Sequence, residues 1–95
     1  MFVHHVLFWL KEGSDKAGMR KGLESLRGIE SIEAIYIGEP VASERPVVDD
    51  SFDFSLMVVL KDLAGHDAYQ VDPLHQQFFK DCSSMWAKVV VYDAS

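Results

Sequence analysis

The chain contains a single cysteine, Cys82, among its 95 residues. One cysteine excludes an internal disulfide, a redox pair and a zinc site built from several thiolates of one chain. We expect Cys82 to be a small buried apolar residue. Basic residues are also scarce, since nine Lys and Arg stand against fifteen Asp and Glu and give a net charge of −6. Affinity for nucleic acid comes largely from basic side chains that neutralise phosphates, so the sequence predicts no nucleic-acid partner.

Long hydrophobic runs are missing as well. The apolar stretch at residues 1–10 contains His4 and His5 and is followed at once by charged residues. It lacks the basic start and the small-residue cleavage site of a signal peptide. No stretch approaches the roughly 20 apolar residues that span a bilayer. We therefore expect a cytoplasmic protein with no membrane partner.

The apolar residues that are present follow the periods of strands and helices. Strands are expected at 2–10, 31–40, 51–60 and 86–93, and helices at 15–27, from 62 to about 70 and from 73 to about 82, with Ser14 and Asp62 as helix caps. Residues 41–50 are expected to form a loop. The order β-α-β-β-α-β in a single domain, residues 1–95, predicts the ferredoxin-like α+β fold. In this fold a four-stranded antiparallel sheet carries its helices on one face.

The expected strands are apolar on both faces. In the first strand Val6 and Phe8 occupy one face, while Leu7 and Trp9 occupy the other. Met57 continues the second apolar face in the third strand. Helices on one side can cover only one face, so the other must be buried by something outside this chain. The sequence predicts a homodimer that packs through this sheet face across a two-fold axis.

The segment 69–79, YQVDPLHQQFF, interrupts a helical pattern with a proline. Aspartate is a favoured N-cap and proline is tolerated at the first helical position, so Asp72 and Pro73 predict that a new helix begins there. The residue before a proline is pushed out of helical geometry, so the chain should bend. In a straight helix, Tyr69 and His75 would lie about 120° apart around the axis, given roughly 3.6 residues per turn. A bend can bring these two side chains together.

A candidate acid–base site follows from this bend. The positive end of the helix disfavours protonation of His75, whereas the nearby carboxylate of Asp72 favours it. A neutral imidazole is the form that a general base requires. His5 can approach the same region if its side chain faces the helices, and His4 then faces the dimer side. The residues alone leave open whether Tyr69 and His75 serve chemistry or packing.

The four histidines do not predict a metal site. His4 and His5 are adjacent on a strand and point to opposite faces, and neither they nor His66 and His75 show a recognised ligand spacing. No glycine-rich phosphate loop is present. We therefore expect no metal and no cofactor.

Three segments, HHVLFWLK near the N-terminus, YQVDPLHQQF and the closing KVVVYD, resemble the stress-responsive α/β-barrel (Dabb) family. The resemblance spans essentially the whole chain. It implies the ferredoxin-like fold and a dimeric α+β barrel, in agreement with the strand pattern.

The resemblance also implies a possible activity. One member, olivetolic acid cyclase, closes a polyketide chain by an intramolecular aldol reaction without a metal or organic cofactor. Its working residues correspond to Tyr69, His75 and His5 here. In that assignment His75 removes a proton next to a carbonyl, Tyr69 donates a hydrogen bond to the developing oxyanion, and His5 orients one of them or the substrate. The sequence departs from the family at Asp72, where histidine is common, which adds an acidic group near the pocket.

Several functions remain open at this point, because a fold does not fix a function. The first is a homodimeric Dabb protein with a pocket for a small apolar or polyketide-like ligand between sheet and helices. The second is a cofactor-free cyclase or lyase that works by acid–base chemistry. Others are a cofactor-free oxygenase acting on aromatic substrates, and a non-catalytic protein whose selected property is the dimer itself.

Overall fold

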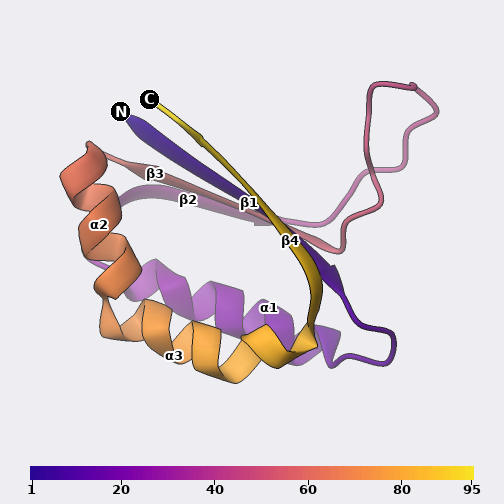
Figure 1. Ribbon diagram of the computed structural model, residues 1–95, viewed down its shortest axis with the longest axis horizontal. Coiled ribbons are helices and arrows are strands. Elements are labelled where there is room, and N and C mark those ends of the chain that lie inside the picture. Colours follow the sequence, from indigo (N-terminus) through magenta and orange to yellow (C-terminus); the bar gives the residue numbers. More distant parts are fainter.

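A computed structural model describes all residues from Met1 to Ser95 and shows one sheet with helices on one side (Figure 1). In chain order the elements are β1 (Phe2–Leu10), α1 (Lys16–Ser25), β2 (Ile32–Gly38), β3 (Phe54–Leu60), α2 (Leu63–Val71), α3 (Pro73–Cys82) and β4 (Trp86–Ala94). Single 3₁₀ turns at Leu26–Gly28 and Ser83–Met85 follow α1 and α3. The predicted order is confirmed, with the second helical region divided into α2 and α3.

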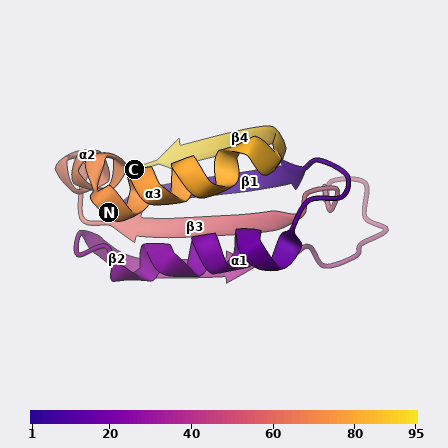
Figure 2. The same ribbon diagram turned by 90° about the horizontal axis from the view of Figure 1, so that it is seen from below.

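The sheet has the strand order β2-β3-β1-β4, and every neighbouring pair is antiparallel. Seen from the helix side, α1 lies in front of β2 and alongside β3, while α3 lies nearer to β1 and β4 (Figure 2). The longest connection, between β2 and β3, projects beyond one end of the sheet (Figure 1). The ferredoxin-like α+β fold predicted from the sequence is therefore confirmed.

Aspartates begin all three helices. The carboxylates of Asp15, Asp62 and Asp72 accept hydrogen bonds from the backbone N–H groups of Gly18, Gly65 and Leu74 at 2.8–2.9 Å. The predicted cap at Ser14 is thus wrong by one residue, and the reason is local. The Ser14 hydroxyl donates instead to the Lys11 carbonyl at 2.6 Å, which leaves the cap position to Asp15.

The third strand begins at Phe54, later than the predicted residue 51. Ser51 is held by the Asp49 carboxylate, which accepts from its backbone N–H at 2.9 Å. Asp53 accepts a hydrogen bond from the Leu10 N–H through its side chain at 2.7 Å. These side-chain contacts compete with regular strand pairing, so the strand pattern alone places the start too early.

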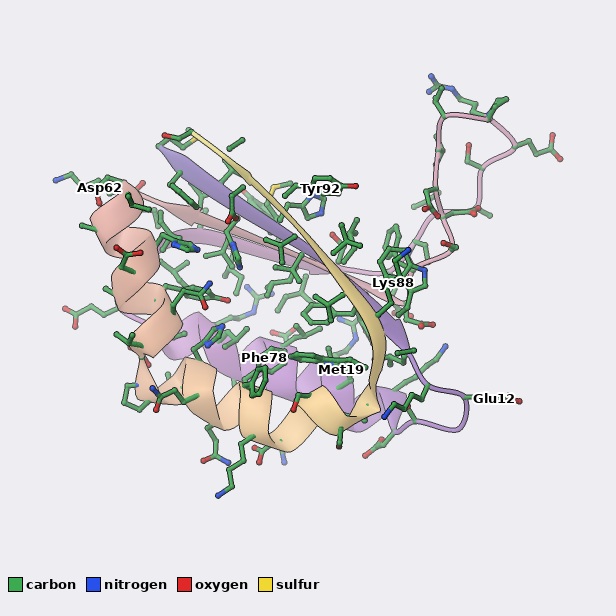
Figure 3. All side chains as sticks on the ribbon, in the orientation of Figure 1. Glu12, Met19, Asp62, Phe78, Lys88 and Tyr92 are labelled. Carbon is green, nitrogen blue, oxygen red and sulfur yellow. The ribbon has the colours of Figure 1, made fainter.

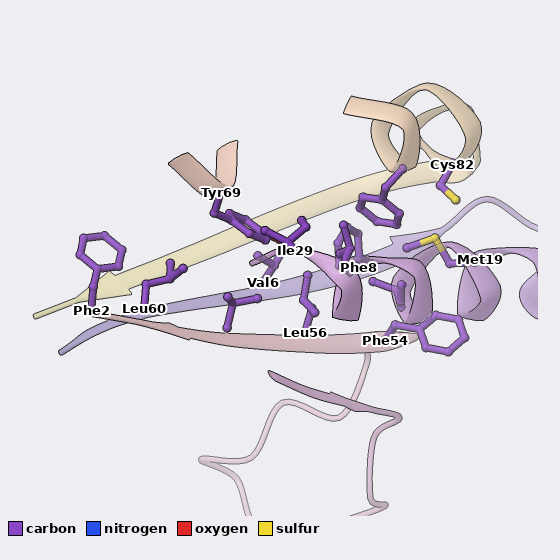
Figure 4. Packing of buried hydrophobic residues seen from close by; sticks show 14 residues of the cluster. Phe2, Val6, Phe8, Met19, Ile29, Phe54, Leu56, Leu60, Tyr69 and Cys82 are labelled. Atoms are coloured by element: carbon purple, nitrogen blue, oxygen red, sulfur yellow. The ribbon is translucent and has the colours of Figure 1, made fainter. Parts of the chain in front are cut away.

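The core lies between the sheet and the helices (Figure 4). It takes even-numbered positions from β1 and β3 and the buried stripes of the helices. Its fourteen buried members are Phe2, Val6, Phe8, Met19, Leu23, Leu26, Ile29, Phe54, Leu56, Val58, Leu60, Tyr69, Phe78 and Cys82. The expected burial of Cys82 is confirmed, since only 2% of this residue is exposed.

The opposite face of the sheet carries no helix. Figure 3 shows Tyr92 on this face of β4, while Phe78 and Met19 point into the space between helices and sheet. Directly paired residues of an antiparallel sheet share a face, so His5 and Tyr92 lie together there, as do Tyr36 and Met57. Tyr36 and Tyr92 are each 62% exposed. None of the helices has both the length and the apolar character needed to cross a membrane.

Candidate functional site

The bend between α2 and α3 brings Tyr69 and His75 together. Asp72 has an extended backbone (φ −61°, ψ 138°) and ends α2, while Pro73 occupies the first turn of α3. The two rings then meet edge to face, with centroids 4.8 Å apart. Tyr69 is fully buried and His75 is half-buried. The contact expected from the Asp-Pro pair is thus present.

A cavity of about 190 Å³ lies beside these two residues. Its polar end is formed by four side chains, and its other walls are aliphatic or aromatic. The polar members are His4, Tyr69, Gln70 and His75; the apolar members are Val6, Phe8, Leu56, Phe78, Phe79, Trp86, Val89 and Val91. Phe79, Val89 and Val91 are also exposed, so the cavity opens between α3 and β4. A small apolar cavity with a few convergent polar groups is typical of a ligand site.

The histidine that joins the site from β1 is His4, and not His5. The His4 ring lies 5.6 Å from the Tyr69 ring, measured between centroids, and only 5% of the residue is exposed. The conditional expectation that His5 faces the helices is therefore wrong. His5 shares its face with Leu7, and its Nε2 atom lies 2.8 Å from the Ser55 hydroxyl on the other side of the sheet. The structure does not bring His5 to Tyr69 and His75.

Burial controls the electrostatics of His75 and Tyr69. Loss of water lowers the pKa of His75, and His4 and His66 nearby lower it further, while the Asp72 carboxylate raises it. The expected opposing effect of Asp72 is present, but burial exceeds it. Burial also raises the pKa of the Tyr69 phenol, so this group remains protonated. The pair therefore presents a neutral imidazole and a hydroxyl donor near neutral pH.

His4 is held by a residue of the last strand. Its Nδ1 atom lies 2.6 Å from Oδ1 of Asp93, which is directly opposite it across β1 and β4. An ionised carboxylate can only accept, so Nδ1 carries the proton and neutral His4 keeps the lone pair on Nε2. Burial lowers the pKa of His4 by more than the bond to Asp93 raises it. His4 is thus an oriented, neutral imidazole at the polar end of the cavity.

The free polar groups decide what the site can do. The hydrogen bonds from His4 to Asp93 and from His66 to Gln70 engage neither the His75 ring nor the Tyr69 hydroxyl. A bound carbonyl compound could accept from Tyr69, and His75 could take a proton from it. No Lys, Arg, Asp or Glu lines the cavity, so it suits a neutral ligand.

Sequence reasoning missed His4 and Asp93. The parity of His4 with Phe2 and Val6 on β1 was the available signal for its direction, because these apolar residues belong to the core face. Asp93 had no signal of its own, since its place opposite His4 depends on the register of β1 with β4.

Comparison with solved structures shows the same fold in several proteins. A protein of Arabidopsis thaliana is 18% identical, with a TM-score of 0.81 over 100% of this chain and 94% of that chain. A hydroxynitrile lyase from Passiflora edulis is 14% identical, with a TM-score of 0.79 over 98% and 90%. A dimeric ferredoxin-like protein of unknown function from Thermobifida fusca is 18% identical, with a TM-score of 0.77 over 99% and 89%. At these identities the likeness establishes the fold alone.

The sequence itself identifies the family. No functionally curated protein matches it. The family model of the stress-responsive A/B barrel domain, in contrast, matches residues 2–95. This chain therefore belongs to the stress-responsive A/B barrel domain (Dabb) family.

Proposed function

We propose that this protein binds a small, neutral, largely apolar carbonyl compound in the cavity between its sheet and helices. The observation that carries the proposal is the convergence of Tyr69, His75 and His4 at one end of an otherwise apolar cavity. Phe78, Trp86 and Phe79 form walls of the cavity and do not fill it. This favours ligand binding over a purely structural role for the bend.

A ligand screen by thermal shift tests the proposal. The probes are a panel of neutral aromatic aldehydes and ketones, with the corresponding alcohols as the matched set without a carbonyl. We expect some carbonyl compounds to raise the Tm, since a ligand that binds only the folded state stabilises it. Tyr69→Phe keeps the ring and removes the hydroxyl, so it should reduce the shift. His75→Gln should reduce it as well.

His5→Gln is the matched control. It replaces a histidine on the opposite face of the sheet and should respond to the probes as the wild type does. Carbonyl probes that shift the Tm equally in wild type, Tyr69→Phe and His75→Gln would contradict the proposed site. The absence of any shift across the panel would contradict the proposed ligand class.

Acid–base catalysis is the second candidate, as a lyase or a cyclase. Two observations favour it: His75 and His4 have lowered pKa values, and a hydroxynitrile lyase shares the fold. In a lyase reaction His75 would take the hydroxyl proton of a cyanohydrin as the bond to cyanide breaks and a carbonyl forms; cyanide would leave with the pair of electrons. An aromatic cyanohydrin assay, followed by aldehyde absorbance, should show turnover that His75→Gln abolishes. Turnover unchanged by His75→Gln would exclude His75 as the base.

The homodimer belongs to the same proposal. The helix-free face of the sheet carries apolar residues that are only partly buried within one chain, among them Leu7, Trp9, Met57 and Val90. The Thermobifida fusca protein with this fold is dimeric. A second copy packed on the same face would cover these residues and place the two cavities on the outer sides of the two sheets.

A further inference from the structure

Three residues from distant parts of the chain gather at the end of the sheet near both termini. Figure 1 shows the N-terminus, the C-terminus and α2 at this end. His4 comes from β1, His66 from α2 and Asp93 from β4. One nitrogen of each histidine and one carboxylate oxygen of Asp93 all lie within 4.8 Å of one another.

We propose that His4, His66 and Asp93 form a binding site for a divalent transition-metal ion of the zinc type. Two imidazoles and one carboxylate are the ligand set of many zinc sites that retain an open position for water or a substrate. Bonds of about 2.0–2.1 Å place ligand atoms on one zinc ion roughly 3.3 Å apart in a tetrahedral site. The ligand atoms lie within 4.8 Å of one another, so the widest separation must close by up to about 1.5 Å, a movement that two side chains can share.

His66 supplies an observation independent of this spacing. Its Nδ1 atom is buried and has no hydrogen-bond partner, although the largely exposed Asp67 carboxylate lies 3.5 Å from it, and the His66 side chain is only 14% exposed. A buried polar atom without a hydrogen bond has lost its water without full compensation. Phe2 stacks on the same ring at 4.6 Å and shields it from solvent. A bound ion would satisfy the spare coordination capacity of this imidazole.

The second nitrogen of His66 is already supported. The Gln70 amide nitrogen lies 3.2 Å from His66 Nε2. The two ends of an amide can exchange by rotation, and with its oxygen toward the ring Gln70 accepts the Nε2 proton. The lone pair then resides on Nδ1. A ligating histidine that donates its other N–H to such a partner is the usual arrangement at metal sites.

Asp93 and His4 are preorganised by their own contact. Their close atoms are 2.6 Å apart and share a proton, which the ion would replace. The atoms must separate by somewhat less than 1 Å for both to bind one ion. The Asp93 side chain is 39% exposed, so it has room to move. Because His4 and Gln70 also line the cavity, the ion would sit beside its polar end.

Titration of tag-free protein with Zn²⁺, followed by isothermal calorimetry, tests the proposal without any organic ligand. We expect one ion per chain. Co²⁺ should bind to the same site and give the visible absorption of a low-coordinate complex. His66→Ala and Asp93→Asn should each weaken binding at least tenfold, since even partners behind the ligands contribute about 10- to 100-fold to metal affinity.

Two variants provide matched controls. His5→Ala removes a neighbouring histidine on the other face of the sheet, and Glu44→Gln removes an exposed carboxylate in the loop between β2 and β3, at the other end of the sheet. Both should bind Zn²⁺ as the wild type does, and circular dichroism should show that all four variants are folded. Failure of the wild type to bind Zn²⁺ would overturn the proposal. It would also be overturned if the controls lost as much Zn²⁺ affinity as His66→Ala and Asp93→Asn. Either result leaves the ligand screen of the cavity unaffected, so the two proposals fail separately.

Discussion

At the scale of single residues, Asp72 has two roles that can be separated. Its carboxylate caps α3 through the Leu74 N–H, and its charge raises the pKa of His75 against the effect of burial. Asparagine caps a helix about as well as aspartate but carries no charge. Asp72 therefore decides both where the helix begins and how readily its histidine takes a proton.

We predict that Asp72→Asn lowers the pKa of His75 further, because the carboxylate that stabilises the imidazolium is removed. A histidine whose folded-state pKa lies below its unfolded value makes the protein less stable as the pH falls through the unfolded value. The loss of stability on acidification should be slightly greater in Asp72→Asn than in the wild type. NMR titration of the His75 ring measures the pKa directly. Near neutral pH the free energy of unfolding should be nearly unchanged.

Asp72→Ala is the companion variant. It removes charge and cap together, so it should lower the pKa of His75 as well and also cost about 1 kcal/mol of stability. An unchanged or raised pKa in both variants would mean that Asp72 does not act on His75 through its charge.

Residue-level prediction succeeded where the signal was local. The Asp-Pro pair predicted a helix start and a bend, and the contact of Tyr69 with His75 followed from it. The direction of His5 was predicted wrongly because the resemblance suggested a first-strand histidine and two adjacent ones were available. The parity of β1 assigns that place to His4, whose neighbours in alternation are core residues.

At the scale of elements, α1 and α3 approach closely at Gly22. A Cβ atom at this position would lie 2.4 Å from Cys82 Sγ and 3.1 Å from Phe78 Cδ1. Both neighbours are buried side chains of α3. The sequence shows a glycine inside a helical pattern, but only the packed structure gives the reason, because the contact joins residues sixty positions apart.

We predict that Gly22→Ala destabilises the protein by about 1–3 kcal/mol, as overpacking commonly does. Alanine otherwise favours a helix by about 1 kcal/mol over glycine, so the overlap determines the sign. Chemical denaturation followed by circular dichroism measures the change. Since Phe78 lines the cavity, a shifted α3 should also weaken binding of any carbonyl probe found in the screen.

Gly65→Ala is the matched control within α2. The nearest atoms to a Cβ there lie at 3.6 Å, which is ordinary contact, so this substitution should be neutral or stabilising. Adding Cys82→Ala to Gly22→Ala removes the closest atom and should recover part of the loss. A stable Gly22→Ala protein would show that the helices separate without cost.

At the scale of the whole molecule, the topology places residues together that no sequence spacing connects. The four histidines gave no ligand pattern, yet His4 and His66 meet beside Asp93 because β1 lies between β3 and β4 and α2 covers one end of the sheet. The order of elements was predictable from apolar periods. The register that sets Asp93 opposite His4 was not, since it depends on pairing between the first and last strands.

The two apolar faces of the sheet lead to the last prediction. Leu7 lies near the middle of β1 on the helix-free face, paired with Ser55 on one side and Val90 on the other. A charged side chain at the centre of an apolar interface would be buried without a partner, which is strongly unfavourable. We predict that Leu7→Lys converts a dimer into a monomer in sedimentation at micromolar concentration, whereas the wild type sediments as a dimer.

Leu63→Lys supplies the control, because Leu63 is 61% exposed at the start of α2 and belongs to neither face of the sheet. It should remain dimeric. A monomeric wild type would contradict the proposed homodimer, and a dimeric, folded Leu7→Lys protein would show that the two copies meet elsewhere. The cavity opens between α3 and β4 on the other side of the sheet, so a folded Leu7→Lys monomer should still bind the carbonyl probes. Under these two proposals, assembly and ligand binding belong to opposite faces of one sheet.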